Sequence, residues 1–449
     1  MPQPPGPSGY PLLGVLPLLL RDPLSVLQEA VEKYGDVVCL GTAPRRVYLV
    51  NHPALIQHVL QEYPDRYAKG RSVDRIRPLL GEGLTTSDGA LWQRQRRLLA
   101  PLFHPHAINN LAPLIVRTTG NHLDRWRSRT NADGPLELMN EMLNLARAII
   151  LKMLFGSRPE TEMAALHQAA ASAIEHTERH VWRLSLLPHR LSFTFDRNLQ
   201  RSLAALDALL HARIKARREK DTGKGDMLGA LLEMRDPETG KTLEQKQLRD
   251  ELVTLLVAGH TTAAAALCWI WILLDQHPLV RKEVERELEG LPDREALSFD
   301  DMEKSGFLRV VVDEALRLYP PTWVTARTAL VDDVIGGYRI PAGAIVLLCP
   351  WLLHRDQRFW SQPEMFLPER FRDAPAEQRP PFSYFPFGGG PRGCPGRSLA
   401  LLEIRLILAL ALSRCRLELL PDQNLTPHAR ITLRPAGPVW FFPHKKGSE

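Results

Sequence analysis

The sequence predicts one mainly α-helical domain with a small β portion, and three observations support this fold class. Segments with helical spacing of apolar residues make up most of the chain, and β-branched strand signals are few. No internal repeat, low-complexity linker or compositional break divides residues 1–449. Because 44% of the residues are hydrophobic, the chain has enough apolar side chains for one large core.

Helices are expected where apolar residues recur every three to four positions between residues that begin or end helices. Gly35 ends an amphipathic helix over residues 23–34, and Pro278 ends a long apolar helix over residues 247–276. The remaining helices are expected over residues 90–102, 136–155, 164–180, 200–218, 225–234, 279–288, 307–319 and 396–413.

Strand signals gather near the two ends of the chain and in one internal segment. They are runs rich in β-branched and aromatic residues, flanked by turn residues. These runs cover residues 37–41, 46–51, 338–350, 431–435 and 439–442. Between residues 356 and 383 lies an irregular stretch that is rich in proline and aromatic residues.

Charge and cysteine content exclude several classes of protein. The 57 Lys and Arg against 51 Asp and Glu give a net charge of +6 without clustered basic blocks, so nucleic-acid binding is not expected. The five cysteines form no CxxC pair, which argues against a disulfide framework and a structural zinc site and favours a reducing cytoplasm. Four of them lie in apolar runs and are expected to be buried: Cys39, Cys268, Cys349 and Cys415.

No membrane anchor is expected from the sequence. The apolar run over residues 12–20 is too short to span a bilayer, contains Pro17 and lacks a preceding basic region. It overlaps a proline-rich N-terminal segment, residues 1–14. A cytoplasmic protein is the resulting prediction.

The fifth cysteine, Cys394, lies in a glycine-rich loop that leads directly into a long apolar helix. Such a loop can cradle a phosphate, but a P-loop ends in Gly-Lys-Ser/Thr, and here Gly393 is followed by Cys394 and Pro395. A dinucleotide site would need a strand-helix-strand unit, which is missing here. The third use is metal ligation, because backbone N–H groups and a helix N-terminus stabilise a thiolate. The glycines also leave room for a large flat ligand.

The ten residues from Phe387 to Gly396, FGGGPRGCPG, resemble the heme-binding loop of the cytochrome P-450 superfamily, the heme-thiolate monooxygenases. The resemblance implies heme b (iron protoporphyrin IX), with Cys394 as the axial ligand of the iron and Phe387 and Gly388 beside the cofactor. It also implies the cytochrome P-450 fold, in which heme lies between a long oxygen-binding helix and the helix after the cysteine loop.

Two further segments resemble motifs of the same superfamily. Glu314-Ala-Leu-Arg317 resembles its Glu-x-x-Arg motif, and FLPERF, which contains Arg370, resembles its Pro-Glu-Arg-Phe segment. The resemblance implies a buried structural triad of Glu314, Arg317 and Arg370. Two guanidinium groups and one carboxylate are tolerated in a core only if their hydrogen bonds are mutually satisfied.

Four residues are expected to bind the heme propionates. Trp92 and Arg96 lie four positions apart on one helix face, so an indole N–H and a guanidinium group can reach the same carboxylate. They match the superfamily's Trp-x-x-x-Arg, and Arg327 and Arg392 match further propionate contacts. Arg94, on a neighbouring face, is expected to be solvated, or else to help dock an acidic electron donor.

The stretch LLVAGHTTA resembles the oxygen-binding helix of the superfamily. Gly259 weakens the helix but would leave space for O2. Two registers are open: one places Thr261 in the usual acidic position and Thr262 in the alcohol position, and the other places His260 and Thr261 there. We prefer the first, and we expect one of the two threonine hydroxyls to bond back to a helix carbonyl.

The missing acid affects the predicted reaction, because a threonine hydroxyl at neutral pH relays a proton but supplies none. Protons would come through water, His260 or the substrate for an O2-dependent monooxygenase that hydroxylates a C–H bond. Alternatively, the protein uses peroxide directly as a peroxygenase, or it is a non-catalytic heme-thiolate binding or sensor protein.

The resemblance places the substrate in contact with variable segments, including residues 71–83 and 169–195. Its implied lining is largely apolar and favours a lipophilic substrate, a fatty acid or a terpenoid. The turn over residues 43–46 could present a cation to a carboxylate at the channel mouth. Electrons are expected from a ferredoxin or flavodoxin and its reductase. The predicted lining residues are Ala258, Thr322, Trp323, Val324 and Ile431.

Overall fold

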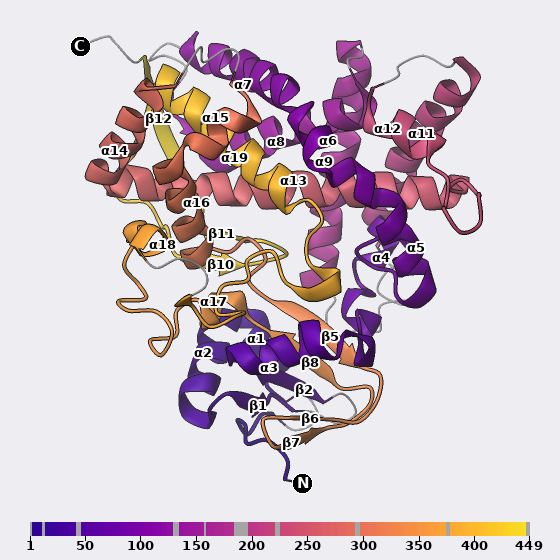
Figure 1. Cartoon of the computed structure of the whole chain (residues 1–449), viewed down its shortest axis with the longest axis vertical. Coiled ribbons are helices and arrows are strands. Elements are labelled where there is room, and N and C mark those ends of the chain that lie inside the picture. The colour runs from indigo at the N-terminus through magenta and orange to yellow at the C-terminus, as the bar shows by residue number, and fades with distance from the viewer. Residues whose placement is uncertain are drawn as a thin grey trace. The chain divides into compact units, whose positions relative to one another are not determined.

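A computed structural model describes residues 2–10, 14–41, 46–128, 134–156, 159–183, 196–220, 225–291, 297–373 and 378–445. Helices dominate and the strands are short, which confirms the mainly α fold class (Figure 1). The chain forms two compact units. The first comprises Met1–Ser72, Gly306–Arg397 and Leu425–Ala436, and the second comprises Val73–Ser305, Ser398–Asn424 and Gly437–Glu449.

The first unit is built on a five-stranded sheet with strand order β1-β2-β8-β5-β3. β2 and β8 pair in parallel, with Val47 opposite Ile345, and the other neighbouring strands are antiparallel. Pairing thus joins the start of the chain to residues that follow almost three hundred positions later. The strands are β1 (Val37–Cys39), β2 (Val47–Val50), β3 (Tyr67–Ala68), β5 (Thr325–Ala329) and β8 (Ile345–Leu348).

Short helices and two small hairpins complete the first unit. α2 begins after Asp22, whose side chain accepts from the Ser25 N–H, and ends at Gly35 with φ 92°, as the sequence predicts. The helices are α1 (Leu16–Arg21), α2 (Pro23–Tyr34), α3 (Pro53–Gln57), η1 (His58–Glu62), η2 (Pro64–Arg66), η3 (Gly70–Val73, which reaches the second unit), α16 (Gly306–Leu318), α17 (Pro350–Leu353), α18 (Glu369–Asp373) and η7 (Gly390–Arg392). The hairpins are β6 (Asp333–Ile335) with β7 (Tyr338–Ile340), and β10 (Pro427–Ala429) with β11 (Leu433–Pro435).

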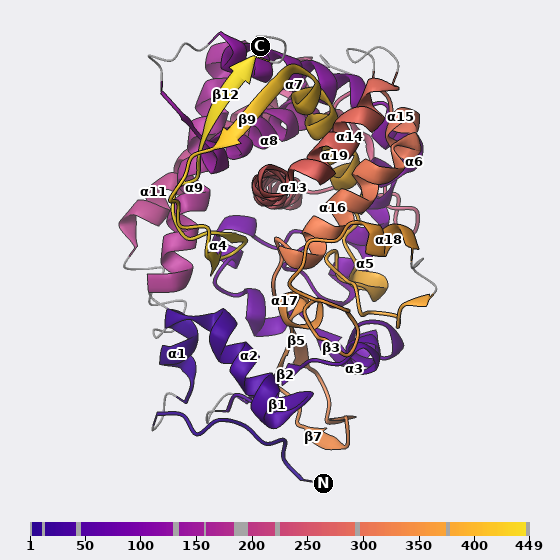
Figure 2. The ribbon, with the colours of Figure 1, turned by 90° about the vertical axis from the view of Figure 1, so that its left-hand side faces the viewer.

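The second unit surrounds the long helix α13, Gln245–Gln276, which packs along α8; Figure 2 shows α13 almost end-on. Its other helices are α4 (Arg77–Leu80), α5 (Gly89–Leu99), η4 (Ala100–Phe103), α6 (Pro105–Asn109), α7 (Ala112–Arg127), α8 (Leu138–Phe155), α9 (Glu160–Arg183), α11 (Arg197–Lys220), α12 (Met227–Glu233), α14 (Pro278–Glu289), α15 (Phe299–Lys304) and α19 (Arg397–Arg414, whose first residue belongs to the first unit). A three-stranded sheet has the order β4 (Leu136–Glu137), β12 (Trp440–Lys445) and β9 (Cys415–Leu419).

Two departures from the predicted elements have local causes. The helix predicted over 136–155 begins at Leu138, because Leu136 and Glu137 pair with β12 as a strand. Helix α7 was not predicted, because Thr118, Thr119 and Gly120 interrupt its sequence with weak helix formers. Burial of its apolar face in the core overrides that weakness.

Helix α13 is the one described helix that is long and apolar enough to cross a membrane. In its most apolar window, 72% of the residues are buried inside the protein. A core helix of a water-soluble protein passes the same test of length and composition.

Candidate functional site

The cysteine loop is closed by hydrogen bonds of its own backbone. The Cys394 N–H donates to the Phe387 carbonyl at 2.9 Å, and the Gly388 N–H donates to the Phe385 carbonyl at 2.9 Å. The loop therefore folds back on itself and leaves Cys394 exposed at its end.

The glycines in this loop serve two different steric needs. Gly390 has φ +63°, and a Cβ built on it would lie 1.8 Å from the Leu60 carbonyl oxygen, so only glycine allows the loop to pass η1 this closely. Gly388 has φ +69°, and a Cβ there would meet nothing within 4 Å. One glycine therefore packs the loop against the protein, whereas the other faces open space.

The remaining cysteines are poor candidates for a ligand. Cys268, Cys349 and Cys415 are buried, Cys39 is half-buried, and none of the five cysteines, all of which are described, forms a disulfide. Burial raises the pKa of the Cys349 thiol to about 12, which disfavours its thiolate. Because it is exposed and lies in the closed loop, Cys394 is the best candidate for a ligand among the five cysteines.

The structure brings the three residues of the predicted triad together in the first unit. Glu314 and Arg317, one turn apart on α16, are both fully buried; the Arg317 Nε donates to Glu314 Oε2 at 2.7 Å and its Nη2 donates to Oε1 at 2.9 Å. The Arg370 Nε donates to the same Oε1 at 2.9 Å. Two guanidinium groups therefore share one carboxylate.

Every N–H of Arg317 has an acceptor. Beyond Glu314, its Nη1 donates to the carbonyls of His354 and Pro363, each at 2.7 Å, and its Nη2 donates to the Met365 carbonyl at 3.0 Å. The five hydrogen bonds offset much of the free-energy cost of removing this guanidinium group from water. A buried guanidinium group with unpaired N–H donors would not have this compensation.

His354 connects this triad to the cysteine loop, a role that no sequence motif predicted. Its ring is fully buried; Nε2 accepts from the Phe385 N–H at 3.0 Å, so Nδ1 carries the proton and donates to the Arg317 carbonyl at 3.2 Å. Burial, assisted by the Arg317 charge, holds the pKa of His354 well below its usual value and keeps the ring neutral. The only sequence signal was a histidine two residues before the irregular stretch 356–383.

The four predicted propionate residues are divided between the two units. Trp92 and Arg96 lie on α5 in the second unit, and both are half-buried. Arg327 lies on β5 in the first unit, 4% exposed, and its Nη1 donates to Thr325 Oγ1 at 3.1 Å. Arg392 lies in η7, half-buried, within the cysteine loop.

Arg94 corrects a prediction. Its Nε donates to Asp236 Oδ2 at 2.7 Å, and that carboxylate is 2% exposed. The expectation of a solvated charge was wrong because a loop more than a hundred residues further along the chain returns to α5. Arg94 fixes α5 to the segment that precedes α13.

Both threonine hydroxyls of the oxygen-helix motif bond back to the helix. Thr261 Oγ1 donates to the Val257 carbonyl at 3.1 Å, and Thr262 Oγ1 donates to the Ala258 carbonyl at 2.9 Å. The prediction that only one of them would do so was wrong. Thr261 is buried, whereas Ala258 is exposed and Thr262 is half-exposed on an otherwise mostly buried helix.

Gly259 and His260 occupy the other faces of this turn. A Cβ on Gly259 would lie 3.0 Å from Ile150 Cδ1, so the glycine permits close packing between α13 and α8. His260 is fully buried, and its Nδ1 bonds to the Leu256 carbonyl at 2.7 Å.

The predicted pocket residues differ in exposure. Thr322 is exposed, Val324 is half-buried and Ile431 is 36% exposed. Trp323 is 6% exposed and its Nε1 donates to the Arg430 carbonyl at 2.8 Å, so it also packs the core of the first unit. Residues 43–45 and 184–195 of the other predicted segments, and residues 1 and 11–13 of the N-terminal segment, lie outside the described residues.

Comparison with known proteins places these features in one family. The cytochrome P450 family model matches residues 4–439. The chain belongs to the cytochrome P450 family. The P450 is 33% identical to cyclooctatin synthase of Streptomyces melanosporofaciens, an alignment that covers 98% of this chain and 95% of the relative.

Other relatives agree. Cyclooctat-9-en-7-ol 5-monooxygenase of the same organism is 33% identical, with 93% and 90% of the two chains covered. Pentalenene oxygenase of Streptomyces avermitilis is 28% identical, with 95% and 94% covered. The crystal structure of the cytochrome P450DA heme domain has a TM-score of 0.88 at 27% identity and covers 99% of this chain and 98% of that one.

The protein is therefore a heme-dependent P450 monooxygenase that binds heme b and uses O2, a lipophilic substrate and redox partners. The described residues fit this cofactor. Cys394 offers an exposed thiol in a loop closed by its own backbone, and the open side of Gly388 leaves space for a flat ring. Arginines in both units offer cations of the kind that propionates need.

Proposed function

We propose that this P450 hydroxylates a terpenoid carbon skeleton. The observation that carries the proposal is the set of similar relatives, whose names refer to cyclooctatin, cyclooctat-9-en-7-ol and pentalenene. The predicted lining supports it, because Ala258, Val324 and Ile431 are apolar and at least partly exposed. A fatty acid is the other lipophilic substrate class.

Cys394 is proposed as the axial ligand of the heme iron, next to Phe387 and Gly388. When bound, heme with a thiolate ligand supplies the oxidising chemistry, because the thiolate donates electron density that favours O–O cleavage. The protein's own contribution here is to hold the sulfur in place. The hydrogen bond from the Cys394 N–H to the Phe387 carbonyl and the link from His354 to Phe385 serve this purpose.

Trp92, Arg96, Arg327 and Arg392 are proposed to bind the two propionates. An indole N–H and three guanidinium groups give charge-assisted hydrogen bonds that fix the orientation of the cofactor. A structural role is proposed for Glu314, Arg317 and Arg370. Their polar groups form hydrogen bonds with each other and with nearby backbone carbonyls.

Thr262 is proposed to hold a proton-carrying water near bound O2. Its hydroxyl donates to the Ala258 carbonyl, so its oxygen keeps lone pairs that can accept a hydrogen bond. Its half-exposed position favours it over the buried Thr261. Gly259 is proposed to leave space beside it.

We further propose that the two compact units act as one catalytic domain, since the family match runs through both. A ferredoxin or flavodoxin with its reductase is the proposed electron source. The cytoplasm is the proposed location, because five cysteines that form no disulfide fit a reducing compartment.

The test is a spectral titration of the purified enzyme against polycyclic sesquiterpenes, diterpenes and fatty acids, followed by turnover under ¹⁸O2 with a surrogate ferredoxin and reductase. We expect a terpenoid to displace water from the iron and to gain one labelled hydroxyl group. Tighter binding and faster turnover of fatty acids would contradict the substrate class. Cys394→Ser tests the ligand, with Cys39→Ser, outside the loop, as the matched control.

Peroxide-driven turnover is a second candidate, and one observation favours it. Helix α13 carries no carboxylate between Glu251 and Asp275, so no side-chain acid lies beside Thr261 and Thr262 on this helix. Peroxide already carries the protons and electrons that O2 needs. Turnover with peroxide as fast as with the reconstituted electron chain would support this candidate, and a much slower rate would count against it.

A further inference from the structure

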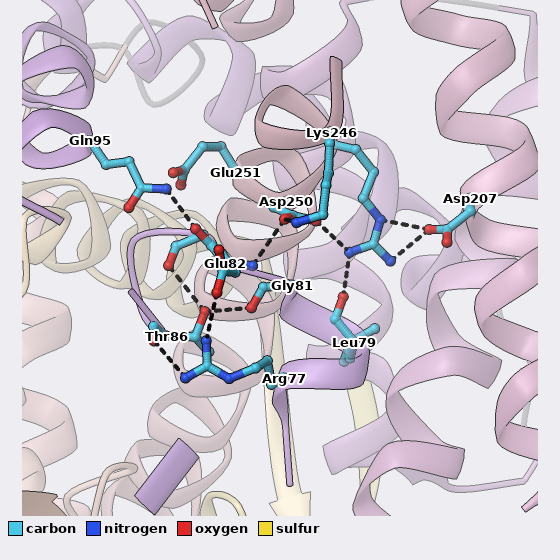
Figure 3. A network of polar contacts seen from close by, with 12 residues as sticks. Arg77, Leu79, Gly81, Glu82, Thr86, Gln95, Asp207, Lys246, Asp250 and Glu251 are labelled. Atoms are coloured by element: carbon cyan, nitrogen blue, oxygen red, sulfur yellow. Dashed lines mark hydrogen bonds and ion pairs between the residues drawn. The ribbon is translucent and has the colours of Figure 1, made fainter. Parts of the chain in front are cut away.

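The segment that precedes α5 is fixed to α13 by two buried carboxyl groups. The Glu82 N–H donates to Asp250 Oδ2 at 2.9 Å (Figure 3). The Leu84 N–H donates to Glu251 Oε2 at 3.0 Å. Asp250 is 3% exposed and Glu251 is fully buried. Two successive acids of α13 therefore bind alternate amides of one loop.

Two glycines allow this loop to lie directly on the helix. A Cβ built on Gly81 would lie 2.1 Å from the carboxyl carbon of Asp250, and Gly81 has φ +58°, which also favours glycine. A Cβ on Gly83 would lie 2.1 Å from Thr254 Oγ1. Any side chain at either position would separate the loop from α13.

The same loop is bound to α5 from its other side. The buried Gln95 donates from Nε2 to the Glu82 carbonyl at 2.6 Å, and its Oε1 accepts from the Ser87 hydroxyl. The peptide groups on the two sides of Glu82 thus join the helices: its N–H binds α13 and its carbonyl binds α5. Gln95 is the neighbour of Arg96 in the sequence.

Asp250 and Glu251 differ in the number of cationic side chains beside them. Asp250 is neutralised by Arg249, whose Nη1 donates to Oδ1 at 3.0 Å, and by Lys246 at 3.2 Å. Arg249 also donates to the Leu79 carbonyl at 2.8 Å and to Asp207 of α11, so it fixes the end of α4 as well.

No cationic side chain in the described part of the chain forms an ion pair with Glu251. Its Oε1 has no hydrogen-bond partner among the described residues, and burial raises its pKa to about 8, opposed by the Leu84 N–H and assisted by the Asp250 charge. The other charged groups in this network are Arg249 and Lys246 on α13, Arg77 and Glu82 on the α4–α5 segment and Asp207 on α11. Glu251 is therefore a neutral acid at pH 7.

We infer that Asp250 and Glu251 are positioning residues for the cofactor. By holding the amides of Glu82 and Leu84, they fix where α5 presents Trp92 and Arg96. This inference rests on the proposed propionate role of those two residues. A loop held only by packing would not need two adjacent acids matched to two alternate amides.

The experiment compares Glu251→Met, which removes the acceptor for the Leu84 N–H, with Glu251→Gln, which keeps an acceptor oxygen. Two readouts on the ferric holoenzyme need no turnover: hydrogen exchange of peptides covering residues 81–95, and the rate of heme transfer to apomyoglobin. We expect Glu251→Met to raise both roughly tenfold, as for a buried amide left without its partner, and Glu251→Gln to restore most of the wild-type behaviour.

The pH dependence of hydrogen exchange over residues 81–95 distinguishes a positioning role of Glu251 from a general loss of packing. The seated loop keeps Glu251 protonated up to about pH 8, whereas a solvated glutamate ionises near its ordinary value of 4.5. Raising the pH through this window therefore favours opening of the loop. Once exchange is corrected for its intrinsic pH dependence, protection of residues 81–95 should fall towards pH 8 in wild type and stay flat in Glu251→Gln.

Two reference variants keep the outcomes separate. Asp275→Leu removes another carboxyl group whose pKa is raised by burial, at the far end of α13, where it accepts from the Leu419 N–H. Equal acceleration of heme loss by Asp275→Leu, or unchanged exchange over residues 81–95 in Glu251→Met, would overturn the inference. Arg96→Met tests the proposed function instead: if it does not accelerate heme loss, the propionate assignment is wrong. If it does and Glu251→Met does not, only the positioning role fails.

Discussion

The ring of His354 accepts a hydrogen bond from the backbone N–H of Phe385 at 3.0 Å, and this contact joins the buried triad to the base of the cysteine loop. The other ring nitrogen donates to the Arg317 carbonyl, and the His354 carbonyl accepts from the Arg317 guanidinium. Movement of the triad would therefore be transmitted to the loop that carries Cys394.

Replacing His354 should weaken the hold on the thiolate. His354→Leu leaves the Phe385 N–H without an acceptor, and we expect a larger fraction of the reduced carbonyl complex to lose its thiolate spectrum. His354→Gln offers an amide oxygen in place of Nε2 and should recover part of the normal spectrum. Identical spectra for His354→Leu and wild type would show that the loop holds its shape without this contact.

Arg317→Met should be strongly destabilising, because it leaves the Glu314 carboxylate buried with only Arg370 as a cation. The expected loss in the free energy of unfolding is about 3–5 kcal/mol, measured by chemical denaturation. The control is Arg339→Met, which breaks an exposed ion pair with Asp332 in the same unit and should change the free energy of unfolding far less, because solvent screens such a pair. A loss for Arg317→Met as small as that of the control would mean that the triad is solvated.

Gly259→Ala should couple to Ile150. Alanine gains about 1 kcal/mol of helix propensity, but its Cβ would lie 3.0 Å from Ile150 Cδ1, and overpacking offsets the gain. In an Ile150→Ala background, which lacks both Cδ1 and the Cγ1 atom that would lie 3.1 Å from the new Cβ, we expect Gly259→Ala to raise the free energy of unfolding. A double-mutant cycle measures this, and zero coupling would mean that the helices separate freely at this turn.

Thr262→Ala should divert reducing equivalents to hydrogen peroxide, because the half-exposed hydroxyl that can hold a water is lost. Thr261→Val is the matched variant: it removes the buried hydroxyl bonded to Val257 and should change the coupling of electrons to product far less. Peroxide release per NAD(P)H consumed is the measurement. If Thr261→Val released more peroxide than Thr262→Ala, the result would support the other register, with Thr261 in the alcohol position.

Glu403 should make stability depend on pH. Burial raises its pKa from 4.5 to about 8, so between these values the folded protein keeps a proton that the unfolded chain releases. Stability is therefore lost as the pH rises through this window. Melting temperatures from pH 5 to 8 should fall less steeply in Glu403→Gln, whereas Glu289→Gln, on the exposed end of α14, should leave the slope unchanged.

Most helices were predictable because their signals are local. Apolar spacing, Gly35 and Pro278 placed α2 and α13 to within two residues, and contiguous motifs located the cysteine loop and the Glu314–Arg317 turn. Strand β5 and helix α7 were missed because Thr325–Ala329 alternates weakly and α7 contains poor helix formers, so pairing and burial decide their structure.

The family, the cofactor and the cysteine that is proposed to bind it could be recognised from the order of the residues, because each depends on a short contiguous motif. The groups that support this chemistry could not, because they come together only when the chain folds. His354 meets a backbone amide 31 positions away, Arg94 finds an acid 142 positions away, and Glu82 binds Asp250 across 168 residues. Backbone amides and lone acids carry no sequence pattern, so their partners are set by how the chain packs.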